Sequence, residues 1–462
     1  MKQYATLFRD GKKQSVLRNV TEDPSKAGQE NQLVNLYPQI RYQTIEGFGG
    51  AFTDAAGYVF SLMPKETQRE FLTGYFSAEG LNYSFGRTSI DSCDFSCEMY
   101  AADDTPEDRT FSRFDMERPM RYVLPLLLKA QETAGRPMQM MLTPWSPPAW
   151  MKTNGSRKHG GQLKKECYPV WAEYICRYLQ EAGKAGMRPR FLSSQNEPKA
   201  SQTWDSCLFT GEEEGEFIRS HLYPAMQRSG LGHVGLLIWD HNKERAFDRA
   251  CETLRDTENM VDGVAVHWYS GDHFEALQMI RDRFPDKRLV FSEGCVEYSL
   301  YKGDNQLRNA RMYAHELFGS LNHGLNVFLD WNLLLDERGG PNHVGNFCDA
   351  PVMYDTKTGK IIRNLSFDYI GHFSHFIQPG ARRIGMSRWK DSLEVLAAQN
   401  PDGSVCAVAM NPKAEPISFF LRLHDRVWPV ALEGDSISTF VFSSDDAGRG
   451  CSKGIHGCFA RG

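Results

Sequence analysis

The sequence predicts an α/β protein: a (β/α)8 TIM barrel with a small β-sandwich domain formed by the two chain ends. Three observations support this. Short apolar segments rich in β-branched and aromatic residues alternate with segments of helical spacing, which is typical of parallel strands joined by helices. Eight such alternations follow one another, the number that closes a barrel of this class. Near the C-terminus the alternation stops, and only strands and turns follow.

The predicted barrel strands are nearly continuous apolar runs, as expected of parallel strands that are buried on both faces. They are Ile45–Phe52, Tyr83–Ile90, Met138–Thr143, Pro189–Ser194, Gly235–Asp240, Gly263–Tyr269, Arg288–Ser292 and Asn326–Trp331. Several segments between them have the spacing of an amphipathic helix, most clearly from Trp171 to Leu179. Another spans Met120–Leu128, where we expect Pro125 to kink the helix.

From Leu393 onward the pattern is that of a small β-sandwich. Two strands, Leu393–Ala398 and Val405–Met410, flank a hairpin loop of turn-forming residues, and three more strands follow as far as Phe442. The first forty residues have no helical pattern and are expected to add strands to the same domain. We therefore expect N-terminal sandwich strands at 1–40, the barrel at 41–382, the C-terminal sandwich at 383–445 and a flexible tail at 446–462.

Composition and charge exclude several classes of partner. The 462 residues are 41% hydrophobic and 24% charged, with a formal net charge of −5, which gives no electrostatic reason to expect a nucleic acid or an anionic membrane. No segment is long and apolar enough to span a bilayer, and no signal-peptide pattern is visible at the start. We expect a cytoplasmic protein without stable membrane insertion; the sequence leaves its oligomeric state open.

The sequence also gives little reason to expect a metal or another cofactor. The 11 cysteines have no paired zinc-type spacing, and the glycines at 47–50 match neither a phosphate loop nor a dinucleotide fingerprint. Histidines 241, 267, 273 and 343 could suggest a metal, but no His-Glu-x-x-His helix accompanies them. We therefore expect hydrogen-bonding histidines, no catalytic metal and no cofactor.

Two glutamates stand where the chemistry of such a barrel should lie, at the carboxyl ends of its strands. Glu197 follows the fourth strand, and Glu293 follows the seventh. A lone carboxylate is costly to bury unless it is paired or takes part in a reaction. Two carboxylates facing one cleft are the minimum for cleaving a glycosidic bond, since one protonates the leaving oxygen and the other attacks the anomeric carbon. Two ordinary salt-bridged glutamates are the alternative, which the polar and aromatic motifs around both residues disfavour.

Other strand ends carry side chains that suit a sugar. Acids and amides can bind hydroxyl groups, and flat aromatic rings can stack on a pyranose. Each side chain alone could instead have a structural role, because a tryptophan at a barrel rim usually packs against its neighbours and Arg87 could form a buried ion pair. Together they predict a pocket for a neutral sugar that includes Asp54, Arg87, Trp145, His267, Tyr269 and Trp331.

These motifs, in this order, resemble glycoside hydrolase family 30, and within it the glucosylceramidase-like β-glucosidases. The matching segments are Phe48–Ala56, Thr143–Gly155, Gln195–Pro198, His267–Tyr269, Ser292–Cys295, Asp330–Asn332 and Gly339–Phe347. The likeness covers nearly the whole predicted barrel, and a β-sandwich built from both chain ends is the second domain of that family.

The resemblance implies a retaining hydrolase of β-glucosidic bonds that forms a covalent glycosyl-enzyme. By motif position, Glu197 would be the acid/base and Glu293 the nucleophile. Asn196 would bind the sugar 2-hydroxyl, and Tyr269 would bind the nucleophile.

The resemblance also implies how the non-reducing glucose is held. Asp54, Trp145 and Trp331 would bind it, Asn346 would line the rim, and an aspartate at position 54 favours glucose over xylose. The substrate is then a carbohydrate, either a β-glucoside or a β-glucan oligosaccharide.

The same resemblance leaves alternatives open. Related β-1,6-glucanases and β-xylosidases have similar barrel motifs, and these residues do not determine the aglycone. A non-catalytic carbohydrate-binding barrel predicts the loss of one glutamate, whereas both are present. A metal-dependent barrel hydrolase would be sensitive to chelators.

Overall fold

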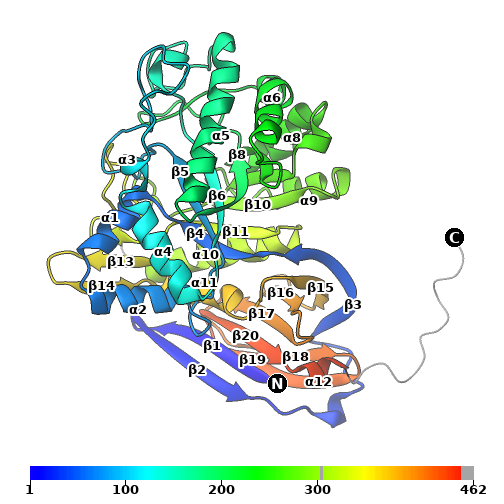
Figure 1. The fold of residues 1–462 in the computed structure, drawn as a ribbon. Coiled ribbons are helices and arrows are strands. Elements are labelled where there is room, and N and C mark those ends of the chain that lie inside the picture. Colours follow the sequence, from blue (N-terminus) through cyan, green and yellow to red (C-terminus); the bar gives the residue numbers. More distant parts are fainter. Residues whose placement is uncertain (302–304, 449–462) are drawn as a thin grey trace, which may run out of the picture. The chain divides into compact units, whose positions relative to one another are not determined.

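The computed structural model describes residues 1–301 and 305–448, which form two compact units (Figure 1). One unit comprises Gly47–Gln306 and His323–Phe367; the other comprises Met1–Glu46, Leu307–Asn322 and the part of the chain that begins at Asp368. The sequence placed the first domain boundary after residue 40. In the structure this boundary lies after Glu46, because the strand β3, Leu33–Ile45, runs through residue 40. Of the expected tail, residues 449–462 lie outside the described part of the chain, and α12, Ser444–Gly448, precedes them.

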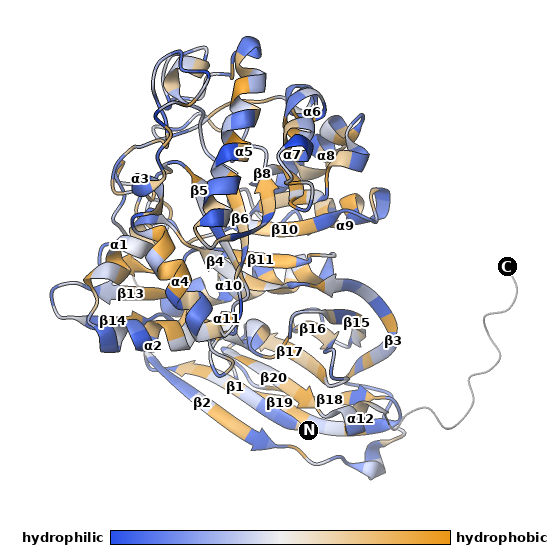
Figure 2. Cartoon of the chain, in the orientation of Figure 1, coloured by the Kyte–Doolittle hydropathy of each residue, from blue (hydrophilic) through white to orange (hydrophobic). Residues whose placement is uncertain are grey.

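The first unit is a closed barrel of eight parallel strands, which confirms the predicted fold class. The strands follow one another around the barrel in sequence order, and each end lies within two residues of its prediction. They are β4 Gly47–Ala51, β5 Phe85–Ile90, β6 Gln139–Pro144, β7 Arg188–Ser193, β8 Gly235–Asn242, β9 Gly263–His267, β10 Arg288–Glu293 and β11 Val327–Asn332. Figure 2 shows predominantly hydrophobic residues along β8, β10 and β11, as burial on both faces requires.

Helices connect the strands, and a small sheet lies in the segment after β11. Helix α5 buries the stripe that its spacing predicts, from Trp171 to Leu179. The helices are α1 Asp54–Leu62, α2 Lys65–Phe76, α3 Glu117–Met120, α4 Val123–Ala134, α5 Tyr168–Lys184, α6 Gly211–Phe217, α7 Tyr223–Arg228, α8 Ala246–Leu254, α9 Phe274–Arg283, α10 Gln306–Asn322 and α11 Leu365–Ser374. The small sheet comprises β12 Leu335–Asp336, β13 Val352–Asp355 and β14 Lys360–Arg363.

The kink expected at Pro125 is absent. The chain instead forms two helices, α3 and α4, and Pro125 occupies the third position of α4. Proline is tolerated in the first turn because the N–H groups there have no partner within the helix. The interruption therefore lies before the proline, at Arg121 and Tyr122.

The second unit contains a nine-stranded sheet, and its strands come from both chain ends as predicted. Its order is β19-β18-β3-β15-β16-β17-β20-β1-β2. The remaining strands are β1 Lys2–Arg9, β2 Lys12–Asn19, β15 Ala381–Arg388, β16 Glu394–Gln399, β17 Val405–Asn411, β18 Ile417–Leu423, β19 Arg426–Leu432 and β20 Ser436–Phe442.

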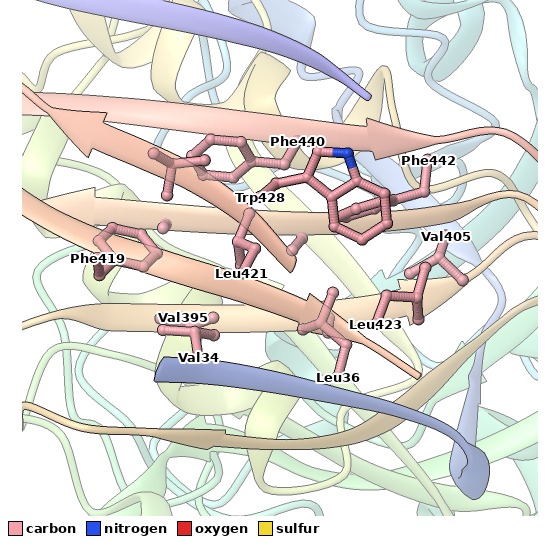
Figure 3. Packing of buried hydrophobic residues seen from close by; sticks show 14 of the residues in the cluster. Val34, Leu36, Val395, Val405, Phe419, Leu421, Leu423, Trp428, Phe440 and Phe442 are labelled. Carbon is pink, nitrogen blue, oxygen red and sulfur yellow. The ribbon is translucent and has the colours of Figure 1, made fainter. Parts of the chain in front are cut away.

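This sheet packs against itself to form the sandwich core (Figure 3). Trp428 of β19 contacts Phe442 of β20 with ring centroids 5.0 Å apart, although the two strands are far apart in the sheet order. Phe419 and Phe440 make a second contact of this kind. Register shifts where β15 pairs with β3 interrupt the ladder between the two halves. In the part of the chain that the structure describes, no helix is both long enough and apolar enough to cross a membrane.

Close approach of β4 and β5 gives a test of the barrel packing. A Cβ atom on Gly49 would lie 2.1 Å from the carbonyl oxygen of Phe85, so Gly49→Ala must separate the two strands. We expect it to lower the free energy of unfolding by about 3 kcal/mol or more, measured by urea denaturation. Gly183→Ala in α5 is the matched control, since nothing lies within 4 Å of the added atom; it should stabilise the protein slightly. Equal effects of the two substitutions would contradict the packing.

Candidate active site

A cavity of about 150 Å³ lies at the carboxyl ends of the barrel strands. Seven residues that the sequence singled out line it: Trp145, Asn196, Glu197, Tyr269, Glu293, Trp331 and Asn346. Three others, Asp54, Arg87 and His267, are buried and are not among its lining residues. The structure thus brings both candidate catalytic glutamates to one cavity.

Backbone strain holds Glu197 at the cavity. Glu197 has a φ of 44°, and Trp239 and Asp240 at the end of β8 have φ of 71° and 45°. Side chains other than glycine rarely adopt this region, and each such residue costs about 1–3 kcal/mol. The N–H of Glu197 donates to the carbonyl oxygen of Asp240 at 3.0 Å, so the two strained segments support each other.

A buried carboxylate behind the cavity supports this strained end of β8. Glu214 of α6 accepts hydrogen bonds from the Trp239 N–H at 3.2 Å and from the Ser194 hydroxyl at 2.5 Å. Arg249 of α8 lies 3.4 Å from the other oxygen of Glu214 and so balances its charge. No sequence pattern predicted this support, because Glu214 lies in an ordinary acidic helix start.

Arg87 connects four barrel strands from beneath the cavity. Its Nη1 donates to Glu293 Oε2 at 2.5 Å, and its Nη2 donates to Asp240 Oδ2 at 2.9 Å and to Asn196 Oδ1 at 2.8 Å. The side chain is completely buried. Arg87 therefore fixes one oxygen of Glu293 and orients the amide of Asn196, whose oxygen faces the guanidinium and whose NH₂ group remains a donor.

His267 lies between two carboxylates. Its Nε2 is 3.0 Å from Asp240 Oδ1, and its Nδ1 is 3.2 Å from Glu197 Oε1. The Ser292 hydroxyl also donates to Asp240 Oδ1, at 2.5 Å. His267 thus acts on the cavity through Glu197.

Glu293 accepts hydrogen bonds on both carboxyl oxygens. Arg87 binds Oε2, and the Tyr269 hydroxyl donates to Oε1 at 3.0 Å. A register shift in the β9–β10 pairing lies between Phe291 and Glu293, and such irregularities redirect side chains. The shift occurs where β10 delivers the carboxylate to the cavity.

The charges around the two glutamates move their pKa values in opposite directions. Burial raises the pKa of Glu293, with a contribution from the charge of Glu197, against the opposing effects of His267 and Arg87. Burial also disfavours ionised Glu197, but the hydrogen bond from His267 and the charges of His241 and His267 outweigh it and lower the pKa of Glu197. Burial opposes charge on His267 too, yet Glu293, Asp240 and Glu197 raise its pKa to about 9.

Two stacked tryptophans form the aromatic part of the cavity. The rings of Trp145 and Trp331 lie 5.6 Å apart with an interplanar angle of 21°. The edge of Phe95 contacts Trp331, and the Arg87 guanidinium lies 4.8 Å from the centroid of Trp145. The predicted pocket therefore has a rigid aromatic wall next to its carboxylates.

Asp54 does not reach this cavity, contrary to the expectation that it binds the sugar. It begins α1, and its two oxygens pair with Arg118 at 2.8 and 2.9 Å. Oδ2 also accepts the N–H of Cys97 at 2.9 Å. Its carboxylate is thus committed to a structural ion pair, which fixes the start of α1 to the segment before α4.

Asp94 occupies the cavity instead, and the sequence analysis missed it. It lies four residues beyond the end of β5 and lines the cavity, where the Asn346 amide donates to its Oδ2 at 3.1 Å. Burial raises the pKa of Asp94 to about 8, with added repulsion from Glu293 and Glu197, against the hydrogen bond from Asn346. Reading the loop after the second strand as closely as the strand itself would have identified it.

The remaining lining residues were not predicted as site residues, although His241 was considered as a possible metal ligand and interpreted as a hydrogen-bonding histidine. Phe95 and Cys295 follow β5 and β10. The others give the cavity a polar and aromatic rim of Gln202, Trp204, His241, Asn242 and Glu297.

Family models match most of the chain. The glycosyl hydrolase family 30 TIM-barrel domain matches residues 45–377. The glycosyl hydrolase family 30 β-sandwich domain matches residues 380–440. Both matches agree with the barrel and the sandwich described above.

Known proteins of similar sequence and structure include hydrolases of two substrates. Lysosomal acid glucosylceramidase from Mus musculus is 33% identical, over 83% of this chain and 78% of its own length. An endo-1,6-β-D-glucanase from Neurospora crassa is 26% identical, over 89% of this chain and 88% of its own. SrfJ from Salmonella typhimurium has 37% identity and a TM-score of 0.90, with 96% of this chain and all of that chain covered.

Asp94 and Asp54 differ in their surroundings, so we expect Asp94→Asn and Asp54→Asn to change the stability of the folded protein in opposite directions at pH 8. Because the pKa of Asp94 is about 8 in the folded protein and roughly 3.9 when unfolded, ionisation of Asp94 destabilises the fold increasingly as pH rises from about 4 to 8. Asp94→Asn cannot ionise and should raise the thermal unfolding temperature at pH 8, with a gain of at least about 1 kcal/mol that disappears near pH 4.

Asp54→Asn is the comparison for this experiment. It leaves Arg118 without its buried partner and should destabilise the protein by about 3 kcal/mol at pH 8. A loss of stability at pH 8 in both variants would contradict the raised pKa of Asp94.

Proposed function

The chain belongs to glycosyl hydrolase family 30, and we propose that it is a retaining β-glucosidase with Glu293 as nucleophile and Glu197 as acid/base. The observation that carries this proposal is that both carboxylates line one cavity while their hydrogen-bond partners differ in kind. Glu293 is held by donors, whereas Glu197 is flanked by histidines.

The hydrogen bonds support Glu293 as the ionised nucleophile. Arg87 can only donate and is always charged, and Tyr269 donates to the second oxygen. These donors orient the Glu293 carboxylate for attack, and Arg87 opposes the effect of burial on its pKa.

Glu197 is suited to exchange protons with the leaving group. The pKa of His267 is raised to about 9, so this histidine carries a proton next to Glu197, and its hydrogen bond and charge lower the pKa of Glu197. The Glu197–His267 pair then holds one proton across 3.2 Å, and only Glu197 of the two lines the cavity. A proton taken from His267 can thus be passed through Glu197 to the glycosidic oxygen and later be recovered from water.

The cavity favours a neutral hexose. Trp145 and Trp331 provide ring surfaces, the Asn196 amide can donate to a hydroxyl, and Asp94 with Asn346 provides a polar pair for hydroxyls farther from the reacting carbon. Asp94 therefore takes the role that we expected of Asp54. These groups support glucose as the sugar that is cleaved.

A β-1,6-linked glucan is a second candidate substrate. The cavity rim includes Gln202, Trp204 and Glu297, and no aliphatic side chain is among the lining residues that the structure describes. Such a rim suits a hydroxylated leaving group. Similarity to an endo-1,6-β-D-glucanase over 89% of the chain agrees with it.

A substrate panel tests the sugar. We expect kcat/KM for nitrophenyl β-glucoside to exceed that for nitrophenyl β-xyloside. Asp94→Ala should lower the glucoside value by about 10–10², the cost of leaving a buried sugar hydroxyl without its hydrogen-bond partner, and should lower the xyloside value less. Equal or reversed wild-type values would contradict the glucose assignment, and inhibition of the wild type by EDTA would indicate a metal-dependent hydrolase.

Azide rescue tests which glutamate is the nucleophile and which is the acid/base. Glu197→Ala removes the base of the second step, so azide should restore turnover of a substrate with a good leaving group and yield the β-glycosyl azide. Glu293→Ala forms no glycosyl-enzyme, so rescue should give the α-azide. Without azide, each substitution should lower kcat by at least about 10²; in Glu197→Ala the kcat/KM of a substrate with a good leaving group should change less, because its first step needs little protonation.

The anomeric configuration of the two products decides the assignment. Exchanged configurations would reverse the two roles. Full activity in either variant would show that the site is misplaced.

A further inference from the structure

Three side chains in the cavity have the arrangement of a metal site. The ligand-capable atoms of Glu197, His241 and His267 all lie within 4.8 Å of one another. Glu197 Oε1 is 3.5 Å from His241 Nδ1 and 3.2 Å from His267 Nδ1. Two imidazoles and one carboxylate form a common protein ligand set for zinc, which leaves a fourth position for water.

The surroundings of His267 are those of a metal ligand. Its Nε2 faces Asp240 Oδ1 at 3.0 Å, and Asp240 is itself held by Arg87 and Ser292. Histidines that bind metals usually donate their other ring N–H to a carboxylate, which fixes the tautomer and strengthens the ligand. With its proton on Nε2, His267 presents the lone pair of Nδ1 toward Glu197.

His241 provides an independent observation. Its Nδ1 is buried and makes no hydrogen bond within the described part of the chain. A buried polar atom without a hydrogen bond is uncommon, and Glu197 Oε1 at 3.5 Å is the acidic oxygen that it faces. The strained residues Trp239 and Asp240, together with a register shift that ends at His241, determine where this ring points.

The lining of the cavity offers carboxyl oxygens and no competing cation. Besides Glu197, the carboxyl groups of Asp94, Glu293 and Glu297 line it, although burial favours their protonated forms. No lysine or arginine is among the described lining residues. Acidic clefts with low-dielectric walls concentrate cations. The ligand atoms thus lie where a divalent ion is attracted.

We propose that Glu197, His241 and His267 bind a zinc ion, and that zinc inhibits the enzyme reversibly. Zinc would bind the lone pairs of Glu197 and so prevent it from donating or accepting a proton. The inhibition rests on the proposed role of Glu197, whereas the binding does not. This metal is an inhibitor and takes no part in hydrolysis.

Calorimetric titration of the full chain with zinc chloride tests the binding. We expect one zinc ion per chain at this site in the wild type, with weak or no binding of magnesium, which prefers oxygen ligands. His241→Gln removes one ligand and should weaken zinc binding at least about tenfold. His273→Gln is the matched control, because His273 precedes α9 as its N-cap residue and does not line the cavity; it should bind zinc like the wild type.

Hydrolysis of nitrophenyl β-glucoside with increasing zinc tests the inhibition. Each variant is compared with its own zinc-free activity. Zinc should inhibit the wild type and His273→Gln at the concentrations at which it binds, and should inhibit His241→Gln only at concentrations at least about ten times higher.

The outcomes separate this inference from the proposed function. Failure to hydrolyse any β-glucoside would contradict the proposed function, while calorimetry would still decide the metal site. Equal zinc affinity in the wild type and His241→Gln, or no binding to either, would overturn the site. Glu197→Gln, measured by calorimetry alone, should weaken binding as well, and unchanged affinity there would exclude Glu197 as a ligand.

Discussion

The buried guanidinium of Arg87 is the interaction on which the rest of the site depends. A cation with no exposure to solvent must be compensated by charges and hydrogen bonds that are themselves buried, because its desolvation costs several kcal/mol. Asp240, Glu293 and Asn196 supply them. Since these three partners lie on β8, on β10 and just beyond β7, satisfying Arg87 on β5 also determines where the cavity is and which way Glu293 faces.

The same arrangement requires backbone conformations that the chain does not adopt easily. Glu197, Trp239 and Asp240 all have positive φ, and they persist because hydrogen bonds to Glu214 and between the two strand ends oppose relaxation. Asp94 adds a second unfavourable feature, a carboxyl group whose ionisation the folded state resists. Both features are concentrated around the cavity. This is expected where a protein maintains a reactive geometry at the expense of stability.

The sequence predicts features that depend on local patterns, and it does not predict features that depend on contacts between residues far apart in the chain. The barrel strands and the two glutamates are predictable because burial on both faces and a carboxylate at a strand end are local patterns. Local patterns do not distinguish Asp54 from Asp94, since both aspartates lie near a strand end among small and aromatic residues. What separates them is Arg118, which lies 64 residues beyond Asp54 and pairs with its carboxylate. Arg87 was correctly suspected of forming a buried ion pair, but its partners lie 109 to 206 residues away.

Asp240 links the two chemical properties of the cavity. One of its oxygens neutralises Arg87, and the other faces His267, so the charge that compensates the buried cation also fixes the histidine ring. A ring fixed in this way can present Nδ1 to Glu197 with a proton, as the proposed acid/base role requires, or without one, which creates a ligand for a metal ion. The two uses exclude each other at a single nitrogen atom. A carboxylate that faces an imidazole across a hydrogen bond can therefore also bind a transition metal, and the second imidazole of His241 adds a further ligand.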